Sequence, residues 1–324
     1  MKLDVKALIV SFRELNIARE KDPERFVMED ALTELLDGIY RYGIQIINLD
    51  IFHADTEEKL SVVLSLHNIL PKDCLCIGAR DETLAMASGL GIASVGYPNP
   101  AIPGQGLYQA NFVVEGFEEV DVAFLKRVHQ RRHGIPWTVA ETRRCILREI
   151  ALEDLDALYG LYQDEASARY VEGMQKDREA EMEVTKAYIR NMYGFYGYGM
   201  WAAIEKSTGD IIGKVGLEGC TLHGEPALQL GYLVGKPYQN KGYATELCQA
   251  ALAFAAEETG FEEINCLIQK ENAVSIHLAE KLGFSWQEEV EIQGKTMQRY
   301  KKLLHFPRNM DIMYPTERKN RRLS

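Results

Sequence analysis

Basic residues are scarce relative to acidic ones, with 37 Lys and Arg against 48 Asp and Glu and a formal net charge of −11. Binding to nucleic acid needs a clustered basic face that displaces counterions, so we expect no nucleic-acid partner. No apolar run approaches the roughly 20 residues that a membrane-spanning helix requires, so we expect no membrane partner. The apolar stretch within residues 1–10 is also too short for a signal peptide.

Cysteine is sparse as well, and the six cysteines have no spacing that is typical of a zinc site. A chain of this length does not need disulfides to hold its core, so we expect free thiols, no metal site and a cytoplasmic location. The remaining composition, 46% hydrophobic and 26% charged over 324 residues, is typical of a globular protein with two domains.

The first part of the chain alternates between strand-like and helix-like segments. Strands are expected at 7–12, 44–49, 74–78, 92–95 and 112–114, and helices at 24–42, 56–70, 82–89 and 122–133. This alternation predicts an α/β domain with a Rossmann-like parallel sheet over residues 1–135.

A break at Gly134 and Pro136 ends the first domain, and residues 136–142 are expected to form a linker. We expect Trp137 within it to dock on one domain or between the two, the alternative being a Trp packed entirely inside the second domain. The second domain spans 143–304. Residues 305–324 form a basic tail with five Lys or Arg and two acidic residues.

The most informative segment of the second domain runs from a strand that ends near Val234, through a turn at Pro237, to a helix that begins after Gly242. Unpaired backbone N–H groups at a helix start attract anions, and glycine lets the backbone approach them closely. The segment therefore predicts a pyrophosphate-binding loop to which Lys241 adds a cation. The alternative is an ordinary strand–turn–helix connection with a glycine hinge.

Residues 143–304 resemble the GNAT superfamily of N-acetyltransferases, and within it the ribosomal-protein N-terminal acetyltransferases. The resemblance rests on Gln239-Asn-Lys-Gly-Tyr-Ala244, on Asn272-x-x-Ser275, on Lys281-Leu-Gly-Phe284 and on the hairpin at 201–216. It implies an α+β fold with a mixed, largely antiparallel sheet. It also implies transfer of an acetyl group from acetyl-CoA, the cosubstrate, to a primary amine that attacks the thioester directly.

The same resemblance assigns binding roles to individual positions. The backbone of Leu233 and Val234 would hold the pantetheine arm, and Asn272 and Ser275 would lie beside the coenzyme. The pyrophosphate would be bound by the amides of Gln239, Asn240, Lys241, Gly242, Tyr243, Ala244 and Thr245.

The chain departs from the family at both proton-transfer positions. Gln229 stands where relatives often carry a Glu base, and Ala279 stands where many carry a Tyr acid. The weak catalytic candidates are therefore Glu225, Gln229 and Glu172. The alternative function is a non-catalytic acetyl-CoA-binding regulatory protein. The expected acceptor is a small-molecule or peptide amine. The negative net charge favours an acceptor that is a cation. Homo-oligomer formation is left open.

Residues 5–133 resemble haloacid dehalogenase-type phosphohydrolases around Cys74-Leu-Cys-Ile-Gly-Ala-Arg-Asp-Glu-Thr83. That family has Mg²⁺-binding acids where this chain has Ala79 and Thr83, and an Asp-x-Asp nucleophile where it has Val-Ser-Phe-Arg at 10–13. Asp50 and Asp55 are the residual candidates. We therefore interpret the domain as a degenerate, non-catalytic relative, with a phosphatase as the third hypothesis.

Overall fold

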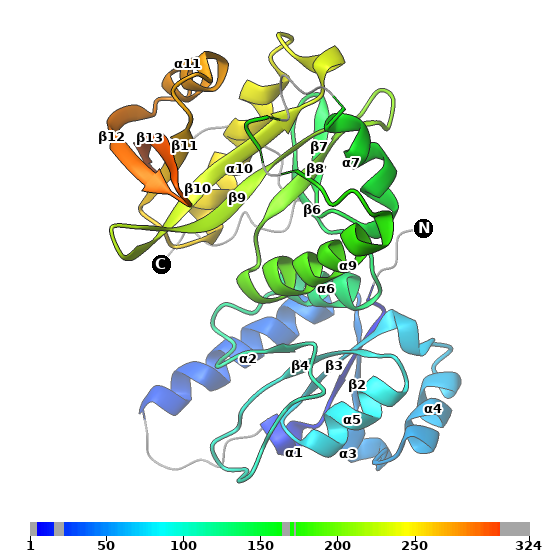
Figure 1. Ribbon diagram of the computed structural model, residues 1–324. Coiled ribbons are helices and arrows are strands. Elements are labelled where there is room, and N and C mark those ends of the chain that lie inside the picture. The colour runs from blue at the N-terminus through cyan, green and yellow to red at the C-terminus, as the bar shows by residue number, and fades with distance from the viewer. Residues whose placement is uncertain (1–4, 16–22, 164–168, 172, 305–324) are drawn as a thin grey trace. The chain divides into compact units, whose positions relative to one another are not determined.

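The computed structural model describes residues 5–15, 23–163, 169–171 and 173–304 (Figure 1). The chain divides into two compact units, residues 1–135 and 136–324. The basic tail predicted at 305–324 lies outside the described residues.

The N-terminal unit is built on a five-stranded parallel sheet in the order β2-β1-β3-β4-β5. These strands are Gln45–Asn48 (β2), Ala7–Val10 (β1), Cys74–Gly78 (β3), Ala93–Gly96 (β4) and Phe112–Val113 (β5). The helices are α1 (Phe12–Leu15), α2 (Pro23–Arg41), α3 (Leu49–Phe52), α4 (Glu57–Leu66), the 3₁₀ turn η1 (Pro71–Asp73), α5 (Asp81–Gly89) and α6 (Val122–Arg132). The predicted parallel sheet is confirmed.

Both faces of this sheet are covered, because alternate residues of β1 enter different hydrophobic clusters. Leu8 and Val10 pack with residues of α2 and α6, whereas Ala7 and Ile9 pack with residues of α4 and α5. A parallel strand that is buried on both faces needs an unbroken apolar run, and β1 has one in Ala-Leu-Ile-Val.

The C-terminal unit contains an eight-stranded mixed sheet in the order β12-β13-β11-β10-β9-β8-β7-β6. These strands are Ser285–Ile292 (β12), Lys295–Leu303 (β13), Glu263–Ile268 (β11), Glu225–Val234 (β10), Ile211–Leu222 (β9), Met200–Glu205 (β8), Cys145–Arg148 (β7) and Thr138–Glu141 (β6). Every neighbouring pair is antiparallel except β10 and β11. The predicted mixed, largely antiparallel sheet is confirmed.

The helical segments of this unit are η2 (Leu152–Asp154), α7 (Leu155–Leu161), α9 (Arg178–Tyr188), η3 (Ile189–Tyr196), η4 (Lys236–Tyr238), α10 (Tyr243–Glu258) and α11 (Ala273–Lys281). The regular α-helix α9 ends at Tyr188, and the chain continues from Ile189 as a π-helix. The wider turn lets Tyr193 become fully buried, while Phe195 stays 77% exposed.

The core of the C-terminal unit lies between the sheet and α10. Trp201 is fully buried there, and its ring centroid lies 4.9 Å from that of Phe254 on α10. Trp137 belongs to the same cluster, with its ring centroid 6.2 Å from that of Phe254. The structure thus places Trp137 inside the core of the C-terminal unit, which is the alternative that the sequence left open and not the docking role we expected.

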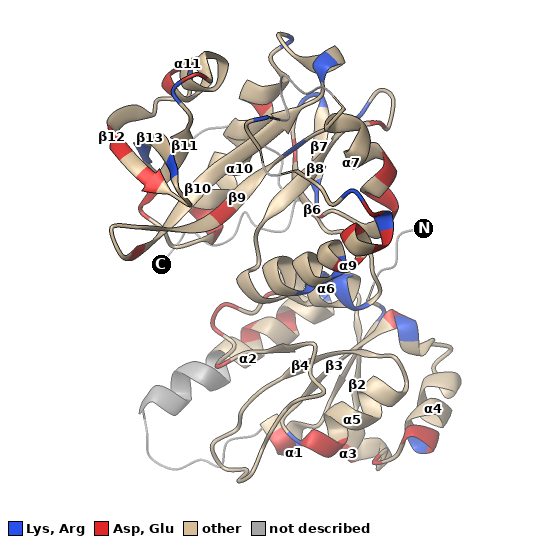
Figure 2. Ribbon diagram, in the orientation of Figure 1, with Lys and Arg blue, Asp and Glu red and all other residues tan. Residues whose placement is uncertain are grey.

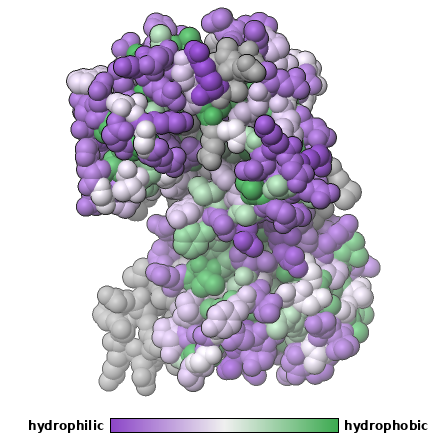
Figure 3. All heavy atoms as spheres, viewed as in Figure 1, coloured by the Kyte–Doolittle hydropathy of each residue, from purple (hydrophilic) through white to green (hydrophobic). Residues whose placement is uncertain are grey.

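The surface seen in Figure 3 is mostly hydrophilic over the C-terminal unit, with hydrophobic residues scattered among polar ones. No helix in the described part of the chain is long and apolar enough to cross a bilayer.

Candidate functional site

The connection between β10 and α10 runs through the turn η4 to the start of a long helix. After the turn at η4, Asn240 and Gly242 both take left-handed φ values, 58° and 81°. Glu246 donates the first α-helical hydrogen bond, from its N–H to the Gly242 carbonyl at 3.2 Å. The N–H groups from Gly242 to Thr245 precede it and have no carbonyl one turn earlier in the helix, so they carry the positive end of the helix dipole.

Arg144, on the loop before β7, braces this connection through three contacts. Its Nη1 donates to the Lys241 carbonyl at 2.9 Å, and its Nε donates to Glu246 Oε2 at 2.7 Å. The guanidinium carbon also lies 3.9 Å from the centroid of the Tyr243 ring. The sequence analysis missed Arg144 and Glu246, because they lie 102 positions apart and no local pattern links them.

The carboxylate of Glu246 is held in its charged form. Partial burial acts to raise the pKa of Glu246, but hydrogen bonds from Thr142 and Arg144 outweigh burial and leave that pKa below its usual value. A lowered folded-state pKa contributes stability above the unfolded-state pKa, and this contribution is lost as the pH falls through the folded-state pKa. The brace is therefore complete at neutral pH and weakens in acid.

Replacing Arg144 with Gln is expected to cost about 1.5–3 kcal/mol of unfolding free energy, since Glu246 would lose a charged partner in a half-buried site. The three tryptophans, at 137, 201 and 286, all lie in the C-terminal unit, so tryptophan fluorescence during urea unfolding reports on this unit. The control is Arg178→Gln, because the Arg178–Asp156 pair is exposed, at 56% and 77%, and should contribute less than about 1 kcal/mol. Equal losses for the two variants would contradict the brace.

The parallel pair β10–β11 is joined near the middle of β10. β10 pairs with β9 from Glu225 to Val234, whereas within the described residues its only bridge to β11 is Gln229↔Asn265. Beyond that bridge the backbone edge of β10 is not bonded to β11, although the Gln239 side chain donates to the Val234 carbonyl at 2.9 Å. Such an edge can pair with an extended ligand that carries amide groups.

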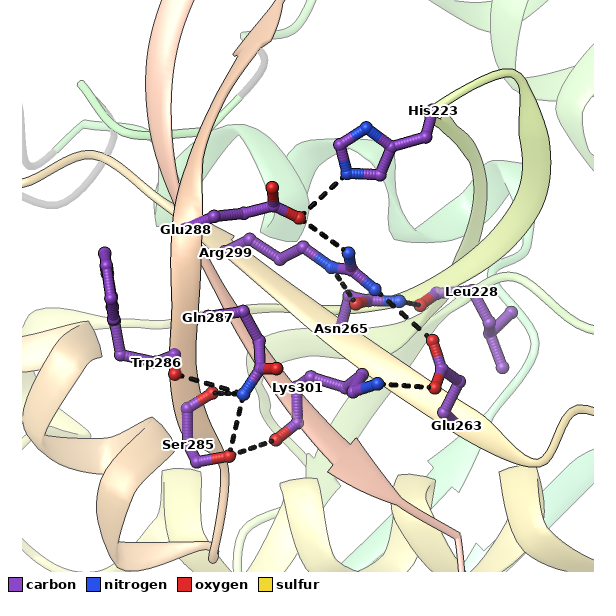
Figure 4. Close-up of polar contacts among 10 residues, drawn as sticks. All are labelled: His223, Leu228, Glu263, Asn265, Ser285, Trp286, Gln287, Glu288, Arg299 and Lys301. Carbon is purple, nitrogen blue, oxygen red and sulfur yellow. Dashed lines mark hydrogen bonds and ion pairs between the residues drawn. The ribbon is translucent and has the colours of Figure 1, made fainter.

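A cluster of polar side chains surrounds the point at which β10 and β11 are bridged (Figure 4). The buried Asn265 donates from Nδ2 to the Leu228 carbonyl at 3.1 Å and accepts at Oδ1 from Arg299 Nε at 2.8 Å. Arg299 also contacts Glu288 at 2.8 Å and Glu263 at 3.3 Å, which links β10, β11, β12 and β13. The cluster therefore sets the point at which β10 and β11 separate.

The start of α11 reaches the separated strands. Asn272 caps this helix, because its side-chain oxygen accepts from the Ser275 N–H at 3.2 Å. The Ser275 side chain lies beside the hydroxyl of Tyr232 on β10: burial raises the pKa of Tyr232, and Ser275 acts in the opposite direction. Ala279 is buried in the core of the unit. Ser275 thus lies beside a side chain of β10, and the position of Asn272 and Ser275 next to the coenzyme stays a prediction.

The three catalytic candidates have different outcomes. Glu225 is exposed at the start of β10, roughly 30 Å along the strand from Val234 at about 3.3 Å per residue, so the structure does not place it at the loop. Gln229 lies midway along the strand, and its Nε2 donates to Glu218 Oε2 at 3.3 Å. Glu172 lies outside the described residues.

The acidic side chains at the carboxyl edge of the N-terminal sheet mostly bind backbone and hydroxyl groups of their own unit. Glu14 accepts from the Ala79 N–H at 3.0 Å and from the Thr83 hydroxyl at 2.6 Å. Asp50 accepts from the Ser11 hydroxyl and the Arg13 N–H, at 2.8 and 3.0 Å. Asp55 is paired with Lys59 on the surface. In the described part of the chain no group of three or more His, Cys, Asp or Glu side chains could hold a metal ion.

Residues 144–285 match the acetyltransferase (GNAT) domain family. The chain is 29% identical over 162 residues to the uncharacterized protein YkkB of Bacillus subtilis (strain 168), which covers 50% of this chain and 93% of that protein. It is 29% identical over 143 residues to the uncharacterized N-acetyltransferase YnaD of the same organism. That match covers 44% of this chain and 79% of YnaD. Among solved structures, a putative GnaT-family acetyltransferase from Bordetella pertussis has a TM-score of 0.43 and 22% identity, covering 50% of this chain and 97% of that one.

Proposed function

Because residues 144–285 form a GNAT acetyltransferase domain, we propose that the chain moves the acetyl group of acetyl-CoA to a primary amine by direct attack on the thioester. The observation that carries this proposal is the connection from β10 to α10. It offers unpaired amides to an anion, and it follows a strand whose edge is open beside β11. A pyrophosphate suits the amides, and the amide groups of a pantetheine arm suit the edge.

In this proposal the amides from Gly242 to Thr245 bind the pyrophosphate, with Gln239 and Asn240 forming the preceding turn. Lys241 adds positive charge, and Arg144 keeps the loop in place through its hydrogen bond to the Lys241 carbonyl. The backbone of Leu233 and Val234 pairs with the pantetheine arm. The acetyl group then lies along the half of β10 that separates from β11.

The chemistry requires a neutral amine, a group that polarises the thioester carbonyl and a proton for the departing thiolate. Holding the amine against the thioester supplies a large part of the rate, because it converts a bimolecular step into an effectively unimolecular one. Backbone N–H groups on the open edge of β10 are suited to polarise the carbonyl.

We propose a cationic acceptor, whose amine belongs to a small molecule or a peptide. The net charge of −11 favours the approach of a cation. Figure 2 shows acidic side chains on β9, the strand that pairs with β10 along its whole length. We also propose a cytoplasmic location, where acetyl-CoA and free thiols coexist.

For the N-terminal unit we propose a degenerate haloacid dehalogenase-like domain without catalytic activity. The first strand is followed by Ser11, Phe12 and Arg13, and not by an Asp nucleophile. The Glu14 carboxylate accepts hydrogen bonds from the Ala79 N–H and the Thr83 hydroxyl, so it joins α1 to the start of α5. Mg²⁺-dependent release of phosphate from simple phosphate esters would contradict this proposal.

The test of the proposed function is release of CoA thiol from acetyl-CoA by the full chain, measured over a panel of amines. The panel holds a peptide with a free N-terminus, a polyamine, an amino sugar and an amino acid. We expect one class to be acetylated with one CoA released per acetyl group, as mass spectrometry of the product would show. Calorimetric binding of acetyl-CoA without turnover of any amine would instead support the regulatory alternative.

A further inference from the structure

The face of the sheet opposite α10 has a strip without side chains where β9 and β10 pair. Gly216 lies directly across from Gly231 in the antiparallel register. A Cβ on Gly216 would come within 2.1 Å of the Gly199 carbonyl oxygen, and one on Gly231 within 3.1 Å of Met200 Sδ. Neither position has room for a side chain, because the backbone of Gly199 fills the space at Gly216 and the Met200 side chain lies against Gly231.

This strip faces away from α10. Leu228 and Leu230 of β10 pack in the cluster that contains α10, whereas Leu233 packs with residues of α7. Side chains alternate along a strand, so Gly231 shares the face of Leu233 and of Gln229. A small group bound on this face at Gly231 would lie along the half of β10 that separates from β11.

The carboxylate of Glu218 lies close to Gly231 in this strip. Glu218 on β9 is the register partner of Gln229 on β10, and Gln229 Nε2 donates to Glu218 Oε2 at 3.3 Å. The same oxygen lies 3.6 Å from the point that a Cβ on Gly231 would occupy. The Glu218 side chain therefore extends from beside Gln229 towards Gly231, where it lies next to the Met200 side chain.

The backbone near the strip is held in place by two tyrosines of the helix that precedes β8. Tyr188 accepts at its hydroxyl oxygen from the Met200 N–H at 2.6 Å. The Tyr193 hydroxyl donates to the Met200 carbonyl and accepts from the Ile150 N–H at 3.1 Å. These contacts fix the position of Met200, whose sulfur borders Gly231, so the strip is a rigid surface beside the Glu218 carboxylate.

We propose that Glu218 is the proton acceptor of the acetyl transfer and that Gln229 is the positioning residue that orients its carboxylate. This inference rests on the proposed function. An amide cannot accept the proton of an ammonium group, but its N–H₂ group can hold a carboxylate in place. At position 229, β10 carries an amide and no carboxylate. Glu218, the residue of β9 that is paired with Gln229, supplies the carboxylate.

The step balances as follows in atoms and charge. The Glu218 carboxylate takes one proton from the acceptor ammonium and later releases it to water. The neutral amine attacks the thioester carbonyl carbon, so a C–N bond forms and the C–S bond breaks. The nitrogen then loses its surplus proton to the departing thiolate, which leaves as CoA thiol. The products are the acetylated amine, CoA thiol and one proton in solution.

The groups around Glu218 keep their charge state near neutral pH. Burial raises the pKa of Tyr188, against the hydrogen bond from Met200, and the Glu218 charge raises it further. Burial also raises the pKa of Cys220 on the same strand, with Arg299 lowering it and Glu218 raising it. The phenol of Tyr188 and the thiol of Cys220 therefore stay neutral near neutral pH.

The test compares Glu218→Gln with the full-length wild type on the amine that the panel identifies. We expect kcat to fall by about 10²-fold near neutral pH, which is the usual contribution of a general base. The dissociation constant for acetyl-CoA should stay within about twofold, because Glu218 is not part of the proposed pyrophosphate loop. The deficit should shrink as the pH rises, since more of the amine becomes neutral without help.

Two further variants separate this role from a structural one. Glu289→Gln removes a carboxylate from an exposed position on β12 and should leave kcat unchanged. The double variant Glu218→Gln/Gln229→Glu exchanges acid and amide across the strand pair, and it should regain at least about tenfold of the lost kcat. Tryptophan fluorescence during urea unfolding checks that each variant is folded.

The outcomes distinguish a failure of the proposed acetyl transfer from a failure of the role of Glu218 alone. No turnover of any amine by the wild type would contradict both the proposed function and the role of Glu218. Turnover by the wild type that Glu218→Gln leaves within twofold would overturn the role of Glu218 alone. A loss that is equal at every pH, with no recovery in the exchanged double variant, would also overturn it and make Glu218 a structural residue.

Discussion

Replacing Gly242 with Glu is expected to raise the dissociation constant for acetyl-CoA by more than tenfold. Gly242 has a φ of 81°, in the left-handed region that costs other residues about 1–2 kcal/mol. A side chain there would also project towards Arg144 Nη2, 3.5 Å from the position of the added Cβ. The new carboxylate would place negative charge at the helix start, where the proposed pyrophosphate binds and would be repelled.

The matched control is Gly260→Glu, just after the other end of α10. Gly260 has a φ of 69° and open space where its Cβ would be, so this change introduces a similar strain and the same charge. We expect it to lower the unfolding free energy by about 1–2 kcal/mol and to leave acetyl-CoA binding unchanged. Calorimetric titration of both variants gives the affinities. Unchanged affinity in Gly242→Glu would remove the pyrophosphate assignment.

The largest effect on stability is expected for Trp201→Ala. Trp201 is fully buried in the core of the C-terminal unit, where its ring meets Phe254 edge to face. Truncation to Ala removes the contacts of a large side chain and leaves a cavity that the strands around it cannot close. The expected cost is about 3–5 kcal/mol of unfolding free energy.

The same truncation at Trp286 provides the control, because that side chain is 55% exposed on β12. Trp286→Ala should cost less than about 1 kcal/mol, in line with other changes at exposed positions. Urea unfolding followed by the fluorescence of the remaining tryptophans reports on the C-terminal unit in both variants. Losses of similar size would mean that Trp201 does not anchor the core.

The sequence predicted the local features of the site because they depend on neighbours in the chain. A glycine with left-handed φ before a helix and an Asn that caps the next helix can both be recognised from a few residues. The expected strands fall on the observed ones with shifts at their ends, since apolar runs determine which residues enter the core.

The features that the sequence did not predict depend on which residues face each other across strands. Glu218 became a candidate only when the antiparallel register placed it opposite Gln229, and the same register places Glu225 at the end of β10 that is far from the loop. Arg144 and Glu246 likewise meet only through the folded sheet. A single sequence without paired-strand information does not contain this register.

Trp137 shows a different limit of sequence analysis. Its size and its place in a short connection indicated a buried position, and it is 7% exposed. The sequence did not indicate which core would bury it, because a connection between two domains can pack on either. The structure resolves the choice through the contact with Phe254.

The most direct test of the account is hydrogen exchange of the full chain, resolved to single amides, with and without saturating acetyl-CoA. If these amides bind the pyrophosphate, we expect slower exchange at Gly242, Tyr243, Ala244 and Thr245, whose N–H groups would donate to it. We also expect slower exchange along the β10 edge at Leu233 and Val234. Saturable binding of acetyl-CoA that slowed exchange at other amides and left exchange at the Gly242–Thr245 amides unchanged would contradict the proposed pyrophosphate site.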